Sequence, residues 1–296
     1  MTSQGTDYKP SISLILPAKN EGKTLSKLLP ELRQLHPAAE IFVVDDGSDD
    51  ETPQICFRNS VIHVHHPYSK GNGAAIKSGA MAASGEYLIM MDADGQHTPA
   101  SIGLLIEKLN SGYDMTIASR DFSSQANLAR GLANVFYNKF ASLVTGQKII
   151  DLTSGMRAVN AKKFRQFLPL LPNGFSYPST ITMAFFRSGY NVAYVPVAVN
   201  KREGKSHIRP IHDGIRFLLI IFKLTTLYSP LKIFFPIALF QAFIGLSYYT
   251  YTYLSDGRFT NMGVTLIVSA VTIFLIGLVS EQITMLLYAR LDTQDD

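Results

Sequence analysis

Short apolar runs alternate with longer amphipathic segments along the first two thirds of the chain. The runs suit buried strands and occupy residues 11–17, 40–45, 61–65, 87–91, 113–119 and 192–197. The segments between most of them have apolar positions at helical spacing, and residues 21–35 are the clearest case, with leucines recurring along one face. Strands that alternate with helices at this spacing predict an α/β fold with a doubly wound, mostly parallel sheet.

The pattern changes in the last third of the chain. Residues 208–228 carry apolar side chains on one helical face and mostly basic ones on the other. We expect this helix to lie in a membrane interface, because apolar spans follow it directly; a surface helix packed on the soluble domain is the alternative. Residues 233–255 and 259–280 contain no charge, and at about 1.5 Å per residue each reaches roughly 33–35 Å, enough to cross a bilayer.

These boundaries predict three parts. Residues 1–207 form the α/β domain, residues 208–228 a juxtamembrane amphipathic helix, and residues 229–296 a two-helix transmembrane hairpin with a short tail. Lysine and arginine residues cluster before the hairpin, and the positive-inside rule therefore places the α/β domain and the C-terminus in the cytoplasm. The first eleven residues are polar and show no cleavable signal peptide.

The composition agrees with this division. Apolar residues make up 47% of the chain and charged residues 17%, below the ~25% typical of soluble proteins, and the deficit lies in the two charge-free runs. The net charge of +4 does not by itself imply a nucleic-acid partner. The single cysteine, Cys56, excludes an intrachain disulfide and fits a reducing compartment.

Candidate chemistry begins at Asp92 and Asp94, which follow the apolar run at residues 87–91. They fall at the carboxyl end of a predicted strand, where ligands bind in open α/β sheets. Two carboxylates one residue apart suit a hard divalent cation, which prefers oxygen ligands. A solvated turn is the alternative, because Asp and Gly are common in turns.

Two further strand ends carry polar residues, at positions 17–21 and 45–48. If the sheet is parallel, these ends are neighbours of Asp92 and describe one cleft. A nucleotide fits such a cleft, since carboxylates accept hydrogen bonds from ribose hydroxyls and base N–H groups, and a metal can bridge to a diphosphate. Residues 70–73 (Lys-Gly-Asn-Gly) precede a predicted helix and either cradle phosphate or simply form a turn.

The order of these motifs resembles a known family. Four of them are similar to the motifs of family 2 glycosyltransferases of the GT-A fold: residues 17–21 (Pro-Ala-Lys-Asn-Glu), 44–48 (Val-Asp-Asp-Gly-Ser), 70–73 and 92–94. Three more, with the membrane hairpin, resemble the polyprenyl-phosphate branch of that family, the dolichol-phosphate mannose synthase-like enzymes: residues 92–99, 151–157 and 202–206. The resemblance covers essentially the whole chain.

The resemblance implies roles for particular residues. The nucleotide-sugar donor would be bound by Pro17, Lys19, Glu21, Val44, Asp46, Asp92, Ala93 and Arg120. A divalent metal, Mg²⁺ or Mn²⁺, would be bound by Asp94 and Gln96, with Asp92 beside them at the diphosphate end. Catalysis would fall to Asp94, Asp151, Arg120, Arg202 and Lys205, of which the basic residues would face the phosphates. Lys19 and Gly95 depart from the family's pattern, in which an aromatic and an apolar residue are usual.

The implied reaction is an inverting, metal-dependent transfer of a sugar from a UDP- or GDP-sugar to undecaprenyl or dolichyl phosphate at the cytoplasmic membrane face. The product would be a polyprenyl-phosphate sugar for cell-envelope or protein glycosylation. The acceptor phosphate, with a second pKa of about 6, is already largely a dianion at pH 7 and needs no strong base. Asp151 is either an orienter or base, or a loop-structuring acid bonded to Arg157 or to backbone N–H groups.

A bacterial inner membrane or a plasma membrane is the expected location, and the membrane helices offer a surface for homo-oligomers.

Three other functions stay open. A polysaccharide-building family 2 glycosyltransferase usually carries an acceptor motif with tryptophan, and this chain has no tryptophan. A non-catalytic nucleotide-sugar-binding membrane protein would not need the intact set Asp92, Asp94 and Gln96. A nucleotidyltransferase shares the sheet and the acidic pair but releases pyrophosphate.

Overall fold

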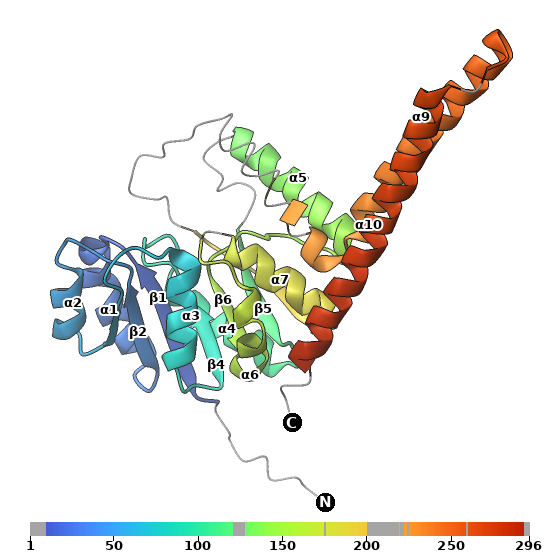
Figure 1. Cartoon of the computed structure of the whole chain (residues 1–296). Coiled ribbons are helices and arrows are strands. Elements are labelled where there is room, and N and C mark those ends of the chain that lie inside the picture. The colour runs from blue at the N-terminus through green and yellow to red at the C-terminus, as the bar shows by residue number, and fades with distance from the viewer. Residues whose placement is uncertain are drawn as a thin grey trace, which may run out of the picture. The chain divides into compact units, whose positions relative to one another are not determined.

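The computed structural model describes residues 10–120, 128–174, 176–199, 219, 222–223, 225–258 and 260–292. The chain divides into two compact units, one formed by Met1–Ser142 and Gln147–Ile208, the other by Leu143–Gly146 and Arg209–Asp296. The first unit contains a sheet with its helices, and the second contains two long helices (Figure 1).

The first unit is built on a seven-stranded sheet with the strand order β3-β2-β1-β4-β6-β5-β7. Its strands are β1 (Ile12–Ala18), β2 (Glu40–Asp45), β3 (Ile62–His65), β4 (Tyr87–Met90), β5 (Met115–Arg120), β6 (Arg157–Asn160) and β7 (Val192–Val197). Neighbouring strands are parallel, except that β6 runs antiparallel to β4 and β5. The predicted α/β fold with a mostly parallel sheet is confirmed. The apolar pattern missed β6, because this strand has four residues and begins with an arginine.

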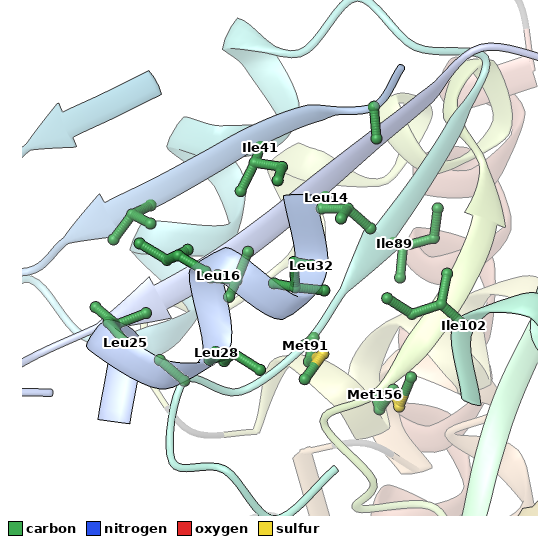
Figure 2. Packing of buried hydrophobic residues seen from close by; sticks show 14 of the residues in the cluster. Leu14, Leu16, Leu25, Leu28, Leu32, Ile41, Ile89, Met91, Ile102 and Met156 are labelled. Atoms are coloured by element: carbon green, nitrogen blue, oxygen red, sulfur yellow. The ribbon is translucent and has the colours of Figure 1, made fainter. Parts of the chain in front are cut away.

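Helices cover both faces of the sheet. One face is covered by α1 (Gly22–Leu35), α2 (Thr52–Arg58) and α4 (Ser101–Asn110), which share a buried cluster with alternate residues of β1 and β2 such as Leu14 and Ile41 (Figure 2). The other face is covered by α3 (Asn72–Ala82), α6 (Ala161–Gln166) and α7 (Tyr177–Arg187). Glycine at position 79 lets α3 approach closely, because a Cβ there would lie 2.5 Å from the side chain of Ile15.

Burial on both faces explains why the sequence identified the central strands. In β2, Ile41, Phe42, Val43 and Val44 are all at most 3% exposed. Central strands of parallel sheets read as continuous apolar runs for this reason, whereas half-buried strands alternate. The helix α5 (Leu128–Thr145) follows β5, and its last residues belong to the second unit.

The second unit is a helical hairpin of α9 (Leu231–Asp256) and α10 (Asn261–Asp292), both long and apolar enough to cross a membrane. Gly257, with a φ of +60°, ends α9 in a left-handed cap. The two helices approach closely at Gly277, where a Cβ would lie 2.5 Å from the Cβ of Phe234. Small residues allow such backbone contact between membrane helices. The second helix continues past the predicted charge-free run, because the single acid at position 281 does not interrupt it.

Glu281 caps the beginning of α9. Its Oε2 atom accepts hydrogen bonds from the N–H of Leu231 at 3.2 Å and from the hydroxyl of Ser229 at 3.3 Å. The first N–H groups of a helix have no acceptor within the helix, and the helix N-terminus favours a negative charge. The Glu281 carboxylate of α10 therefore supplies an acceptor to the N-terminal end of α9.

The structure describes only part of the predicted juxtamembrane helix at residues 208–228. The described positions are 219, 222–223 and 225–228, and all of them are helical.

Candidate functional site

The carboxyl ends of the parallel strands meet at one edge of the sheet. Ala18, Asp45 and Met90 end β1, β2 and β4, and β1 lies between the other two strands. β6 runs the other way, so its first residue, Arg157, reaches the same edge opposite Met90. The loops after β1, β2, β3 and β4 and the loop before β6 therefore lie together, and the predicted convergence of the motifs is confirmed. A hollow at the opposite edge, lined in part by Lys162, involves none of these loops.

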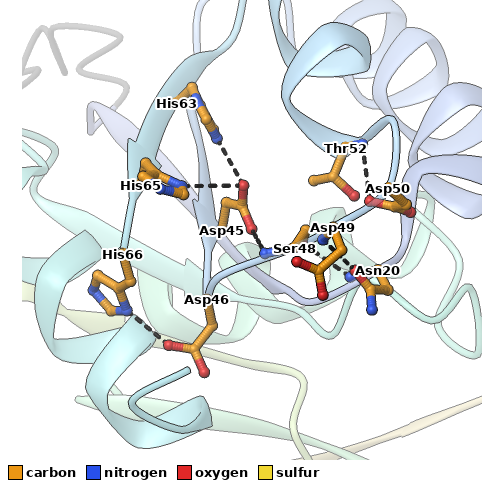
Figure 3. Close-up of polar contacts among 10 residues, drawn as sticks. All are labelled: Asn20, Asp45, Asp46, Ser48, Asp49, Asp50, Thr52, His63, His65 and His66. Carbon is orange, nitrogen blue, oxygen red and sulfur yellow. Dashed lines mark hydrogen bonds and ion pairs between the residues drawn. The ribbon is translucent and has the colours of Figure 1, made fainter. Parts of the chain in front are cut away.

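Hydrogen bonds join the loop after β1 to the loop after β2 (Figure 3). The N–H of Asn20 donates to Ser48 Oγ at 2.9 Å, and Asn20 Oδ1 accepts from the N–H of Asp49 at 2.8 Å. The N–H of Gly22, at the start of α1, donates to Asp50 Oδ2 at 2.9 Å. The two motifs expected to bind the donor thus form one hydrogen-bonded unit.

Four of the predicted donor-binding residues lie on these strand ends. Pro17 lies opposite Val44 in the β1–β2 register; Val44 is buried and Lys19 is exposed. Glu21, at the N-cap of α1, is half-buried and accepts a hydrogen bond from Thr24 Oγ1 at 3.2 Å. The structure brings these residues together, and their contact with a donor stays a prediction.

Asp46 organises the loop after β3. Its carboxylate accepts hydrogen bonds from His66 Nδ1 at 2.7 Å and, at 2.8 Å each, from Ser69 Oγ and the N–H groups of Lys70 and Gly71. Burial acts to raise the pKa of Asp46, but these hydrogen bonds outweigh it and lower the pKa to about 2. Gly71, with a φ of +103°, completes the turn before α3. The protein's own donors fill the roughly four lone-pair positions of the carboxylate, and its predicted contact with the nucleoside stays a prediction.

The segment from Asp92 to Gln96 follows β4 after one residue, Met91. Asp92 and Asp94 are half-buried and Ala93 is buried. Asp94 Oδ1 accepts from the N–H of Gln96 at 3.1 Å, and Gly95 has a φ of +72°. The left-handed backbone explains the glycine at this position, because other side chains are strained there. The segment forms a turn, and its carboxylate and amide oxygens are the ligands that Mg²⁺ and Mn²⁺ prefer; metal binding here stays a prediction.

The loop before β6 touches Asp92. A Cβ on Gly155 would lie 2.0 Å from Asp92 Oδ2, so this approach requires a glycine. Asp151 is buried and accepts hydrogen bonds from the N–H and the hydroxyl of Thr153, at 3.1 and 3.2 Å. Asp151 therefore bonds within its own loop, as expected of a loop-structuring acid. Its role as a base or as a residue that orients the acceptor stays a prediction.

Arg157 is a fully buried charge beside these acids. Its guanidinium donates to the carbonyl oxygen of Pro178 at 2.9 Å and to Thr182 Oγ1 at 3.1 Å. Burial lowers the pKa of Arg157, and the negative charges of Asp151 and Asp92 oppose that shift. From the sequence, Arg157 is predicted only as a possible partner for Asp151. A charged residue inside an otherwise apolar stretch was the signal that could have identified it as part of the site.

The structure describes little of the three basic residues that are predicted to face the phosphates. Arg120 ends β5 and lies opposite Val197 of β7 in register, and the structure describes its backbone position only. Arg202 and Lys205 lie outside the described residues. The roles of all three stay predictions.

A second set of possible metal ligands was not predicted. Asp45, His63 and His65 each offer a ligand atom, and the three atoms lie within 4.8 Å of one another. The signal in the sequence was the spacing of the two histidines, because residues two apart in a strand share one face.

Two family descriptions match the chain. Glycosyl transferase family 2 matches residues 13–168, just over half of the chain, and the GtrB C-terminal hairpin matches residues 229–286. The first match spans the sheet from β1 to β6 and includes every loop of the site. The second match spans α9 and most of α10.

Two relatives carry names that describe their reactions. Dolichyl-phosphate hexose transferase of Haloferax volcanii is 24% identical over 212 residues, which are 71% of this chain and 92% of the relative. Polyprenol monophosphomannose synthase of Mycolicibacterium smegmatis is 27% identical over 205 residues, which are 64% of this chain and 77% of the relative.

The fold resembles a solved structure of glucosyl-3-phosphoglycerate synthase from Mycobacterium tuberculosis in complex with Mn²⁺, UDP and glucosyl-3-phosphoglycerate. The TM-score is 0.59 at 17% identity, and the similarity covers 76% of this chain and 86% of that chain. The predicted GT-A type of fold is confirmed.

Proposed function

The chain belongs to glycosyl transferase family 2, and on this premise we propose that it transfers a sugar from a UDP- or GDP-sugar to a polyprenyl phosphate. The contact of Gly155 with the Asp92 carboxylate carries the proposal. It joins an acid of the motif that resembles family 2 glycosyltransferases to the loop that resembles the polyprenyl-phosphate branch. The names of the two relatives and the matching hairpin support the same acceptor.

The donor lies along the loops after β1, β2 and β4. Pro17, Lys19, Glu21, Val44 and Asp46 surround the nucleoside, and Asp92 and Ala93 lie at the diphosphate. Asp94 and Gln96, with Asp92 beside them, would hold a divalent metal, which would supply Lewis acidity at the diphosphate of the donor. Mn²⁺ and UDP in the structurally similar synthase support this donor set.

An oxygen of the acceptor phosphate is the nucleophile that attacks the sugar. Its second pKa of about 6 leaves it largely dianionic at pH 7, so the protein's task is to position it. Arg120, Arg202 and Lys205 offset the repulsion between acceptor phosphate and donor diphosphate. In-line attack on the sugar inverts the anomeric centre. Asp151 and Arg157 hold the loop before β6 through hydrogen bonds to Thr153 and to the carbonyl oxygen of Ser154, and both substrates lie against this loop.

The two apolar helices keep this chemistry at a membrane surface. The sheet, the juxtamembrane helix and the hairpin correspond to residues 1–207, 208–228 and 229–296. The excess of lysine and arginine before α9 favours a cytoplasmic location for the catalytic part.

Purified full-length chain in detergent tests the proposal. UDP- and GDP-sugars are screened against undecaprenyl and dolichyl phosphate with Mg²⁺ or Mn²⁺, and release of nucleoside diphosphate together with a lipid-linked sugar is the expected result. Release of pyrophosphate would instead indicate a nucleotidyltransferase, and a growing glycan a polysaccharide-building enzyme. No turnover with any pair would contradict the proposal.

Asp94→Asn tests the metal assignment. We expect turnover to fall by about two orders of magnitude or more, because the site loses an anionic ligand. Glu107→Gln on the exposed face of α4 is the matched control and should leave turnover unchanged. Full activity of the Asp94 variant in the presence of EDTA would contradict the assignment.

A further inference from the structure

A carboxylate and two imidazoles converge at the β2–β3 end of the sheet, away from the Asp92 turn. β3 is the edge strand, and His63 and His65 lie on the same face of it. Asp45, the last residue of β2, lies opposite His65 in register. Its Oδ2 atom faces His63 Nε2 at 3.2 Å and His65 Nδ1 at 3.4 Å (Figure 3).

We propose that Asp45, His63 and His65 bind a transition-metal ion of the Zn²⁺ class. Zinc bonds to nitrogen and oxygen of about 2.0–2.1 Å place tetrahedral ligand atoms about 3.3 Å apart. The distances from Asp45 Oδ2 to the two ring nitrogens match this separation between ligand atoms. All three ligand atoms lie within 4.8 Å of one another. Three protein ligands leave the fourth position to water.

The same distances are long for charge-assisted hydrogen bonds. Charge-assisted hydrogen bonds between an imidazole and a carboxylate are usually about 2.7–2.9 Å. The neighbouring pair of His66 and Asp46 is of that kind, at 2.7 Å. Asp45 instead faces two rings with one oxygen, and at 3.2 and 3.4 Å both contacts are longer than that charge-assisted bond.

The site is held ready for an ion. Asp45 is fully buried, and its second oxygen, Oδ1, accepts the N–H of Ser48 at 2.8 Å, which orients Oδ2 toward the rings. Such contacts to a ligand's other atom fix its direction and raise metal affinity. The side chains of His63 and His65 are 28% and 52% exposed, so an ion can enter from solvent.

The ligand chemistry separates this site from the donor site. Imidazole nitrogen suits zinc, nickel and copper, whereas the oxygen set of Asp94 and Gln96 suits Mg²⁺ or Mn²⁺. The two sites can therefore hold different ions in one solution. An ion bound to Asp45 would join the ends of β2 and β3. Asp45 is the residue before Asp46, whose carboxylate holds the loop after β3.

Zinc titration by calorimetry tests the proposal on the full-length chain in detergent. Any affinity tag is removed, bound metal is stripped with chelator, and Mg²⁺ is kept at millimolar excess. We expect one equivalent of Zn²⁺, and a loss in affinity of about tenfold or more in both His63→Gln and His65→Gln. Co²⁺ in place of Zn²⁺ should give the visible absorption of a four-coordinate ion in the unmodified chain and lose it in both variants.

Two control variants separate this site from the others. His36→Gln, at the end of α1 near the start of β2, and Asp94→Asn, in the donor site, should bind Zn²⁺ as the unmodified chain does. Zinc binding that survives in both histidine variants, that is lost in the Asp94 variant, or that the unmodified chain lacks would overturn the proposal. Each result is independent of turnover, so the glycosyltransferase proposal stands or falls separately.

Discussion

Gly155 is the residue whose replacement acts most directly on the candidate site. In Gly155→Ala the new Cβ would overlap the Asp92 carboxylate, which must move. Because a displacement of about 1 Å in a site can cost two orders of magnitude in rate, we expect kcat/KM for the donor to fall by at least about tenfold. Steady-state kinetics measure this loss.

Gly103→Ala is the matched control for that substitution. A Cβ at Gly103, in the helix α4, meets no atom within 4 Å. Alanine is the better helix former, so this variant should keep its kinetics and gain about 0.5–1 kcal/mol in stability. Equal kinetics in both variants would show that the contact of Gly155 with Asp92 does not matter for turnover.

Asp46 links the stability of the first unit to pH. Its pKa is about 2 in the folded chain and near 3.8 when unperturbed, so its ionised form stabilises the fold above pH 4. That contribution, about 1–2 kcal/mol after solvent screening, is lost as pH falls from about 4 to about 2. Thermal unfolding of Asp46→Asn and the unmodified chain should therefore differ at pH 7 and converge near pH 2. A gap that is the same at both pH values would contradict this account.

The helix pair α9–α10 depends on its glycines. In Gly277→Ala the new Cβ would lie 2.5 Å from the Cβ of Phe234, and the helices must separate locally. We expect a loss of about 1–3 kcal/mol, seen as a lower Tm in detergent. Gly263→Ala is the control, since a Cβ there meets its nearest atom at an ordinary 3.6 Å. An unchanged Tm in the Gly277 variant would mean that the helices do not pack closely there.

Elements buried on both sides were predictable, and the contacts between loops were not. β1, β2 and β4 appear in the sequence as continuous apolar runs because both of their faces are covered. β6 and α2 are short, with four and seven residues, and no apolar period identifies them. The approach of Gly155 to Asp92 depends on the antiparallel direction of β6, so it could not be derived without that strand. The ligand pair His63 and His65 was visible as spacing, but its partner Asp45 emerged only from the β2–β3 register.

The orientation of the whole molecule in a membrane can be tested with introduced cysteines, because its single native cysteine is unreactive. Cys56 is buried, and burial together with the charge of Asp45 raises the pKa of its thiol to about 11, so it does not react at neutral pH. Arg258→Cys, exposed between the two helices, should react with a membrane-impermeant maleimide on intact cells. Lys27→Cys, exposed on α1, should react only after the membrane is permeabilised. The reverse pattern would place the catalytic part outside the cytoplasm.

Glu281 has a consequence for the order in which the hairpin forms. During synthesis α9 emerges first, and its first turn then lacks the carboxylate that later accepts from Leu231 and Ser229. The first N–H groups of a helix lack acceptors within the helix, so the start of α9 is completed only when α10 has formed beside it. The two helices should therefore reach their final packing as a pair, because an acid that follows the second charge-free run completes the first turn of the helix before it.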